Sequence, residues 1–382
     1  MSQLKTLILG GGIGGIVASQ VLKKALGKDM HVAVIDKDDK HHFASSYPLM
    51  LIGERTPESI TRNLSNLEKK DIEFIHAEIK GIDPMKKQVK TDKGTISGDY
   101  MIISLGAEYN LKSLPGFSRY AYNIYDFAEL SLVSQILPRF QEGHIVLFIS
   151  SLPFKCPPAP YENIFLLDQF FRQKGLRSRV DLTLITPEPS PEPFAGPLVG
   201  QSIRKMLADR HINLITQAKV LSLEPGKLIL DHTTIKGDLF LGIPSHQTSL
   251  VLRESDLVDS TGWVLVDMYT LETVYPNVYA IGDATAIKLP VIGADAPKAG
   301  IFANYQAEVV SRNIALKVRG KRPRYKYKGK GACIMNTGFG RSRYSTVHYY
   351  RKPSPFITLM RPTHSSYWGK IIFEKYWLNR WI

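Results

Sequence analysis

The sequence predicts an α/β fold in which strands alternate with helices, and three observations carry this prediction. An apolar strand at residues 4–9 runs through a glycine-rich turn into an amphipathic helix. A second strand, turn, helix and strand follow one another over residues 144–189. Two more buried strands, within residues 99–107 and 275–286, each lead into a glycine turn. Such alternation is typical of parallel sheets that are covered by helices.

Length and composition fit this fold class. The chain has 382 residues, enough for two or three domains, and 44% hydrophobic with 22% charged residues is ordinary for a globular protein. The net charge of +14 favours anionic partners such as acidic lipid, nucleic acid or an acidic protein. No run of about 18 apolar residues occurs. The N-terminus is short and glycine-rich in its apolar part, so we interpret it as the first strand and expect no signal peptide.

Residues 4–36 contain a nucleotide-binding loop in its usual setting. The pattern GxGxxG is formed by Gly10, Gly12 and Gly15, between the strand and the helix. Gly10 allows a tight turn, Gly12 lets a pyrophosphate approach the backbone, and Gly15 lets helix and strand pack closely. The next strand, "HVAVID", ends in Asp36, about 20 residues beyond the loop, where a carboxylate bonds a ribose 2′-hydroxyl. The spacing predicts a dinucleotide site.

Two later motifs indicate which dinucleotide is bound. "DYMIISLGA", with Gly106, and "YPNVYAIGDATA", with Gly282 and Asp283, resemble the ATG-like and GD motifs of flavoproteins with two dinucleotide domains. In that family the acid of GD holds the ribitol and phosphate of FAD. The resemblance therefore implies two Rossmann-like domains, with an FAD domain that is split in sequence and a second domain inserted into it. We expect FAD-domain parts at residues 1–110 and 236–320, the second domain at 111–235, and a C-terminal region at 321–382.

A long helix is expected behind the GD motif. Asp295 can cap it, Pro297 falls near its first position, and apolar residues then repeat at helical spacing. Lys298 and the first amides of this helix are expected to face the flavin, where they would stabilise the negative charge of its reduced form. A solvated lysine at a helix start is the alternative for Lys298.

The second domain lacks a glycine loop. The turn after its strand "HIVLFIS" reads "SLPFKCPPAP", with no glycine and with prolines that have no amide donor. A pyrophosphate could not approach this backbone closely, so we expect no NADH here. Cys156 takes the place instead, and Cys333 is the second of the two cysteines. Neither has metal-ligand spacing, and we expect no metal. Two inert buried thiols are the alternative.

The cysteine segments resemble those of a known family. "KCPPAPYE", with Cys156 and Glu162, is similar to a segment of sulfide:quinone oxidoreductases and of the flavoprotein subunit of flavocytochrome c sulfide dehydrogenases. "GACIMNTGFG", with Cys333, resembles the second redox-cysteine strand of that family. The resemblance runs from Gly10 to the C-terminal aromatics. It implies that a disulfide or polysulfide bridge between the cysteines accepts sulfide and passes electrons to FAD and then to quinone.

Several details follow from this resemblance. We favour Cys333 as the cysteine that faces the flavin, and Glu162 is a candidate proton carrier if burial raises its pKa. Glu162 could instead complement the dipole of the helix that it begins. The segment "YAYNIYDFAEL" lacks the third cysteine by which many family members tether the flavin, so we expect non-covalent FAD. A histidine common in the family is also missing from "PEPSPEPFAGPLVG".

The C-terminal region is dense in Arg, Lys, Tyr and Trp. Such a mixture suits a membrane interface, although the apolar side chains of residues 368–382 are spread around much of a helical wheel. We expect a peripheral membrane protein on the cytoplasmic side, an anionic membrane surface as partner, and quinone entry past Phe339 and Tyr344. Packing of these aromatics on the body of the protein, or in a homo-oligomer, is the alternative. No recognised nucleic-acid fold accompanies the basic residues, so we expect no nucleic acid.

Three other functions remain open on the sequence. A sulfide dehydrogenase could pass its electrons to a c-type cytochrome, but such subunits are exported. A type II NADH:quinone dehydrogenase would need the glycine loop that is missing. A redox sensor or binding module would keep FAD and use the two cysteines as a switch, without turnover.

Overall fold

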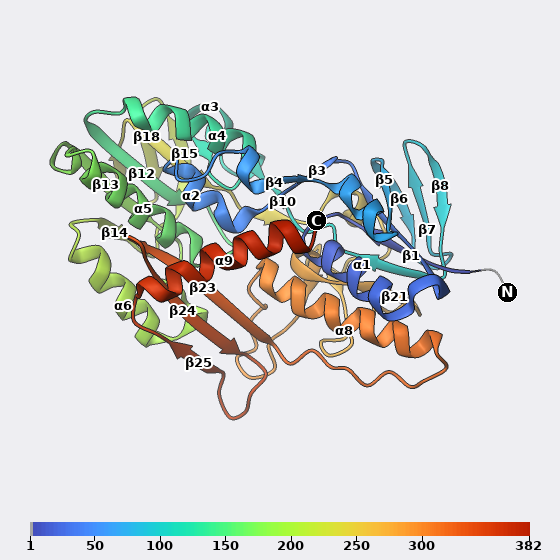
Figure 1. Cartoon of the computed structure of the whole chain (residues 1–382). Helices are drawn as coiled ribbons and strands as arrows, with labels where there is room; N and C mark the ends of the chain where they lie inside the picture. The colour runs from blue at the N-terminus through green and yellow to red at the C-terminus, as the bar shows by residue number, and fades with distance from the viewer. Residues whose placement is uncertain (1–2) are drawn as a thin grey trace.

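The computed structural model describes residues 3–382 and confirms the α/β class, with two parallel sheets and a C-terminal sheet and helix (Figure 1). The first sheet has the strand order β21-β9-β1-β2-β5, and all neighbouring strands are parallel. Its strands are β1 (Leu4–Leu9), β2 (Met30–Asp36), β5 (Glu73–His76), β9 (Tyr100–Ile103) and β21 (Val278–Ala280). The last of these comes from far along the chain, so this domain is split in sequence.

Both faces of the first sheet are covered. Ile8 points to the face on which α1 (Ile13–Leu26) and α8 (Gly300–Val318) pack, while Leu7 and Leu9 point to the other face. That other face meets a small antiparallel sheet of β6 (Ile79–Asp83), β7 (Gln88–Thr91) and β8 (Gly94–Ser97). Burial on both faces explains why the parallel strands are apolar almost throughout.

The second sheet has the order β11-β18-β12-β13-β14 and is also parallel. Its strands are β11 (Tyr122–Asn123), β12 (Gly143–Ile149), β13 (Val180–Ile185), β14 (Asn213–Ile215) and β18 (Leu239–Ile243). On one face lies α5 (Ala159–Gln173), with α4 (Phe127–Ile136) and α6 (Pro197–Ala208) nearby. On the other face lies the antiparallel sheet of β15 (Val220–Glu224), β16 (Lys227–Leu230) and β17 (Thr234–Lys236). Because β18 pairs with β12, the second domain continues past residue 235.

The C-terminal region forms an antiparallel sheet and one long helix. The sheet is β23 (Lys330–Gly338), β24 (Arg341–His348) and β25 (Phe356–Leu359), and the helix is α9 (His364–Arg380). In Figure 1, α9 crosses the front of the molecule from the second domain to the first, so that the C-terminus ends near α1. Within residues 3–382, no helix has both the length and the apolar character to cross a membrane.

The start of α8 differs from the expectation. The helix begins at Gly300, with Ala299 as its N-cap, and not at Asp295 or Pro297. Lys298 lies in the extended chain before it and pairs with Lys155 as an isolated parallel bridge. The backbone N–H of Cys156 donates to the carbonyl of Lys298 at 2.6 Å. The turn at residues 150–158 that carries Cys156, here called the cysteine turn, therefore pairs with the segment at Lys298. Because of this pairing the segment is extended, although Asp295 and Pro297 are local signals for the start of a helix.

Candidate active site

The glycine loop leaves room for a pyrophosphate where one is expected. Gly10 has φ +105°, and a Cβ there would lie 2.4 Å from the carbonyl oxygen of Ser104. A Cβ on Gly15 would lie 1.9 Å from the carbonyl oxygen of Gly10. Gly12 differs, because a Cβ there would meet nothing within 4 Å. The backbone is therefore closely packed at two of these glycines, Gly10 against Ser104 and Gly15 against Gly10. Gly12 instead faces open space at the N-terminus of α1, where anions are favoured.

Asp36 lies at the end of β2 beside this loop. Its carboxylate accepts hydrogen bonds from the N–H of Gly11 at 2.5 Å and from the N–H of Asp38 at 2.9 Å. Burial raises the pKa of Asp36, and the two backbone donors oppose that rise. The carboxylate is thus fixed at the position where a ribose hydroxyl would donate to it.

The GD motif offers a second fixed carboxylate. Asp283 lies in the short 3₁₀ turn Gly282–Ala284, and its Oδ1 is buried without a hydrogen-bond partner in the described part of the chain. Such an orphaned oxygen fits a cofactor hydroxyl as its donor, because buried polar atoms are seldom left unpaired. Gly106, with φ +67°, faces open space as Gly12 does. The loop, the two carboxylates and these glycines together fit a dinucleotide such as FAD.

Lys298 lies against Asp283 and is not a solvated side chain. Its Nζ donates to the carbonyl of Asp283 at 2.8 Å and lies 3.3 Å from the ring centroid of Trp263. Burial lowers the pKa of Lys298 to about 8, although the charge of Asp283 opposes this. A cavity beside the two residues is lined further by Phe302, Tyr327, Tyr349 and Tyr350.

The cysteine turn meets β23 at this junction of the domains. Cys156 is half-buried with φ +55°, a left-handed conformation uncommon outside glycine, and its carbonyl accepts from the hydroxyl of Tyr125 at 3.2 Å. Cys333 is half-buried on β23, opposite Ser345 of β24. Burial raises the pKa of both thiols, to about 12 for Cys156, and a charge on Cys156 would raise that of Cys333 further. The two thiols therefore lie within electrostatic reach of each other, and both are free.

Glu162 lies in the first turn of α5, three residues after the helix begins, and is buried. Its carboxylate pairs with the ammonium of Lys370 from α9. Burial raises the pKa of Glu162, while Lys370 and the side chain and backbone of Asn336 oppose the rise. Glu162 therefore does more than complement the dipole of α5, because its carboxylate also forms a buried ion pair with Lys370.

Sequence reasoning missed three titratable residues of this site. Lys370 gave no local signal, because it meets Glu162 across 208 residues of sequence. Glu188 and Glu192 lie in the proline-rich segment "PEPSPEP" that follows β13. Burial raises the pKa of Glu188 to about 7, and burial together with the charge of Glu188 raises that of Glu192 to about 8. The available signal in the sequence was that this segment contains two glutamates and lacks the histidine that is common in the family.

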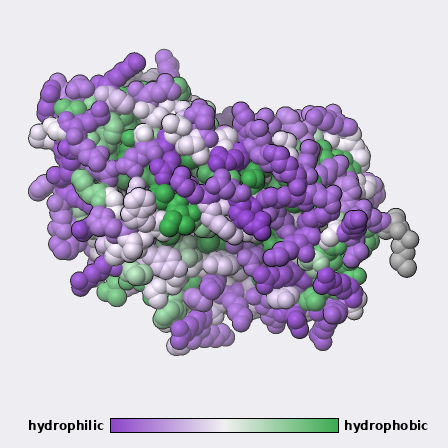
Figure 2. Space-filling view, in the orientation of Figure 1, coloured by the Kyte–Doolittle hydropathy of each residue, from purple (hydrophilic) through white to green (hydrophobic). Residues whose placement is uncertain are grey.

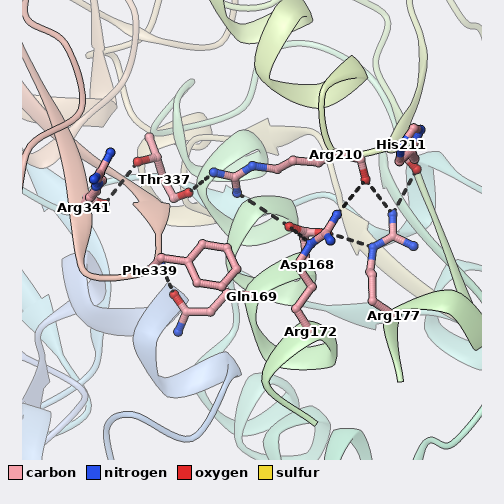
Figure 3. A network of polar contacts seen from close by, with 9 residues as sticks. All are labelled: Asp168, Gln169, Arg172, Arg177, Arg210, His211, Thr337, Phe339 and Arg341. Carbon is pink, nitrogen blue, oxygen red and sulfur yellow. Dashed lines mark hydrogen bonds and ion pairs between the residues drawn. The ribbon is translucent and has the colours of Figure 1, made fainter. Parts of the chain in front are cut away.

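A polar network holds α5 against the end of β23 (Figure 3). Asp168 of α5 is fully buried and pairs with Arg172, Arg177 and Arg210. Arg210 in turn donates to the carbonyl of Thr337 at 2.6 Å. Thr337 lies on β23 with Cys333, and Asp168 lies on α5, the helix that follows the turn of Cys156, so this network ties together the two segments that carry the cysteines.

Phe339 and Tyr344 lie at different places on the C-terminal sheet. The N–H of Phe339 donates to Gln169 at 2.5 Å, and its ring lies 5.8 Å from the guanidinium of Arg210, with 45% of the residue exposed (Figure 3). Tyr344 is half-buried on β24, opposite Ile334. Neither lines the tyrosine-rich cavity beside Lys298. Their proposed contact with quinone stays a prediction.

Within residues 3–382, no three His, Cys, Asp or Glu side chains gather as metal ligands would. The arrangement instead joins a dinucleotide loop to two thiols and a buried carboxylate. Two parallel dinucleotide-type domains with such a pair of thiols define the class of flavin-dependent disulfide oxidoreductases.

Comparison with known proteins agrees with this class. Residues 4–138 match the family described as pyridine nucleotide-disulphide oxidoreductase. The chain is 26% identical over 370 residues to the mitochondrial sulfide:quinone oxidoreductase of Mus musculus, covering 91% of this chain and 79% of the mouse protein. It is 26% identical to the sulfide-quinone reductase of Aquifex aeolicus, covering 97% and 90%. The solved structure of the Aquifex aeolicus sulfide:quinone oxidoreductase matches with a TM-score of 0.90 and 24% identity, covering 99% and 91%. The predicted resemblance to the sulfide:quinone oxidoreductase family is confirmed.

Proposed function

We propose that this chain is an FAD-dependent sulfide:quinone oxidoreductase. The observation that carries the proposal is the turn after β12, where Cys156 replaces a glycine loop and its N–H bonds to the chain just before α8. That contact holds the backbone of Cys156 against the segment that follows the GD motif, and its thiol would lie beside Cys333 of β23. The overall reaction would convert HS⁻, a proton and quinone into zero-valent sulfur and quinol.

FAD would be held without a covalent bond to the chain. Gly10, Gly12 and Gly15 would accept the pyrophosphate, while Asp36 would bind the ribose and Asp283 the ribitol. Lys298 and the N-terminus of α8 would stabilise negative charge on the reduced form. When bound, the flavin would accept two electrons from the site formed by Cys156, Cys333 and Glu162, here called the sulfur site, and pass them on to quinone.

The chain's own residues would run the sulfur half of the reaction. In the oxidised protein Cys156 and Cys333 would share a disulfide or polysulfide bridge. HS⁻ attacks one sulfur of that bridge, so that one S–S bond forms, one breaks and a cysteine thiolate leaves. After the persulfide loses its proton, its outer sulfur would bond to that cysteine sulfur as two electrons leave for the flavin, so that the bridge closes again with one more sulfur atom. Glu162 would take up the proton that HS⁻ releases.

The C-terminal region would attach the protein to an anionic membrane surface. α9 exposes Trp368, Ile372 and Tyr376 at helical spacing, and Figure 2 shows hydrophobic and intermediate atoms over this helix among hydrophilic ones. Residues 324–330 add a row of exposed cations: Arg324, Lys326, Lys328 and Lys330. Exposed rings and exposed cations both suit a headgroup region, from which quinone would enter past Phe339 and Tyr344. Attachment on the cytoplasmic side and a homo-oligomeric state stay predictions.

The alternatives predict different reductants and acceptors. An NADH:quinone dehydrogenase would need a pyrophosphate to reach the turn at residues 150–158, which has prolines in place of glycines. A sulfide dehydrogenase would pass electrons to a cytochrome, and a redox sensor would show no turnover with sulfide and quinone.

The test is stopped-flow absorption of the oxidised flavin after mixing with sulfide or, separately, with NADH. We expect rapid bleaching by sulfide in the wild type and loss of that bleaching in Cys156→Ser and Cys333→Ser, with no bleaching by NADH. Reduction of all three proteins by dithionite is the control that each flavin is intact. Bleaching by NADH, or indifference to both cysteines, would replace this proposal by the NADH dehydrogenase.

A further inference from the structure

α9 presents two opposite faces to different surroundings. Its outer face carries the exposed side chains of Trp368, Ile372 and Tyr376. Its inner face buries Lys370 and Glu374, one helical turn apart. The same helix that is proposed to touch the membrane thus places charged groups inside the protein.

The two buried charges have different partners. The Glu374 carboxylate accepts from the guanidinium of Arg55 at 2.8 Å and from the hydroxyl of Ser46, both near α2 (Tyr47–Leu51). Lys370 pairs with Glu162, and the two residues are only 8% and 4% exposed. A buried ion that loses its partner is strongly disfavoured, so each member of the Lys370–Glu162 pair depends on the other to stay charged.

Glu162 lies among the groups of the sulfur site. Cys156 is in the turn before its helix, Cys333 and Asn336 come from β23, and Glu192 comes from the segment before α6. Glu192 repels a charge on Glu162, and so do the thiolates of both cysteines. Asn336 opposes the rise in the pKa of Glu162 that burial causes. Lys370 acts on Glu162 and on both thiols, while the guanidinium of Arg343 from β24 acts on Glu192.

We propose that Lys370 is a positioning residue of the sulfur site, which keeps Glu162 ionised and oriented so that Glu162 can accept the proton of the attacking sulfide. The inference rests on the proposed function. Without Lys370, burial and the neighbouring anionic groups would favour the protonated form of Glu162 near neutral pH. A protonated carboxyl cannot act as the base.

The first experiment is the pH profile of flavin bleaching by sulfide in the full-length FAD-bound protein. In Lys370→Gln we expect the acidic limb of the profile to move up by at least about one pH unit, which is about a tenfold loss of rate at a fixed pH on that limb. The rate should recover at higher pH, and Lys370→Arg should stay close to wild type. If Lys370→Gln fails to bind FAD, Lys370→Met keeps the aliphatic stem and replaces it.

Glu374→Gln is the matched control, because it breaks the other buried ion pair on the same face of α9. It is expected to lower stability without moving the acidic limb. An equal displacement in Glu374→Gln, or a lower rate at every pH in Lys370→Gln without displacement, would mean that Lys370 only holds the helix in place, and would overturn the inference.

A second readout needs neither sulfide nor quinone. Infrared difference spectra of Lys370→Gln against the double variant Glu162→Gln/Lys370→Gln should show the carbonyl stretch of a protonated carboxylic acid at pH 7. The wild type against Glu162→Gln should not show it. Absence of this band in Lys370→Gln would contradict the inference even if sulfide bleaches the flavin. Failure of sulfide to bleach the wild type would contradict the proposed function alone.

Discussion

The indole N–H of Trp377 donates to Nε2 of His41 at 3.3 Å, while Nδ1 of the same imidazole bonds to the carbonyl of Gly11 in the glycine loop at 3.3 Å. Burial lowers the pKa of His41 to about 4, so the ring is neutral and its two nitrogens have opposite roles. A chain of two hydrogen bonds therefore joins α9 to the loop that is proposed to hold FAD.

Trp377→Phe should weaken FAD binding by about fivefold, because it removes one buried hydrogen bond of about 1 kcal/mol and leaves an aromatic ring in place. Fluorescence titration of the apoprotein with FAD measures this. Trp381→Phe is the control, since Trp381 stacks on Trp377 with ring centroids 5.5 Å apart and makes no contact with His41 among those described. Equal effects of the two variants would show that only aromatic packing matters.

Two glycines of the loop should respond differently to alanine. Gly12→Ala should leave the melting temperature of the apoprotein unchanged, because its Cβ meets no protein atom within 4 Å, but should weaken FAD binding at least about tenfold. Gly15→Ala should lower the melting temperature itself, because its Cβ would lie 1.9 Å from a backbone oxygen. Calorimetry of the apoproteins and FAD titration separate the two effects. Normal FAD affinity in Gly12→Ala would place the pyrophosphate elsewhere.

Asp168→Asn should destabilise the protein by about 3–5 kcal/mol, because it removes the buried anion that pairs with three arginines (Figure 3). Urea unfolding followed by fluorescence measures the change. Asp209→Asn is the control, because its pair with Lys205 is exposed to solvent and should contribute at most about 1 kcal/mol. A similar small loss in both variants would mean that the arginine cluster is solvated in solution.

Glu188 should make stability fall as the pH rises. Its pKa is about 7 in the folded protein and 4.5 as an ordinary glutamate, so between these values only the unfolded chain loses the proton. Unfolding then releases a proton, and the cost of burying Glu188 is absent below about pH 4.5 and complete above about pH 7. Glu188→Gln stays neutral, so its stability relative to wild type should improve by up to about 3 kcal/mol across this window. Urea unfolding between pH 4.5 and 8 measures it, and a difference that does not vary with pH would contradict the assignment.

The parts of the site that local spacing determines could be predicted from the sequence. Gly10, Gly12, Gly15 and Asp36 belong to one strand–helix–strand unit, in which a fixed number of residues leads to a fixed geometry. The absence of glycine at residues 150–158 is equally evident from the sequence, and Cys156 lies in that stretch.

Contacts between distant segments could not be predicted in this way. Lys370 reads as one more cation in a basic tail, and only the packing of α9 on α5 brings it to Glu162. The predicted start of α8 was wrong for a related reason. Asp295 and Pro297 are good local signals for the start of a helix. The pairing of Lys298 with the cysteine turn is a tertiary contact that outweighs them.

The bond from the N–H of Cys156 to the carbonyl of Lys298 bears on motion between the domains. Cys156 belongs in sequence to the second domain, but its backbone is fastened to the segment that leads into α8 of the first. If the second sheet rocks against the first, the bending must occur in the chain on either side of this bond. The backbone of Cys156 would then keep its distance from α8 and from the glycine loop that is proposed to bind FAD, and electron transfer would not have to wait for domain closure.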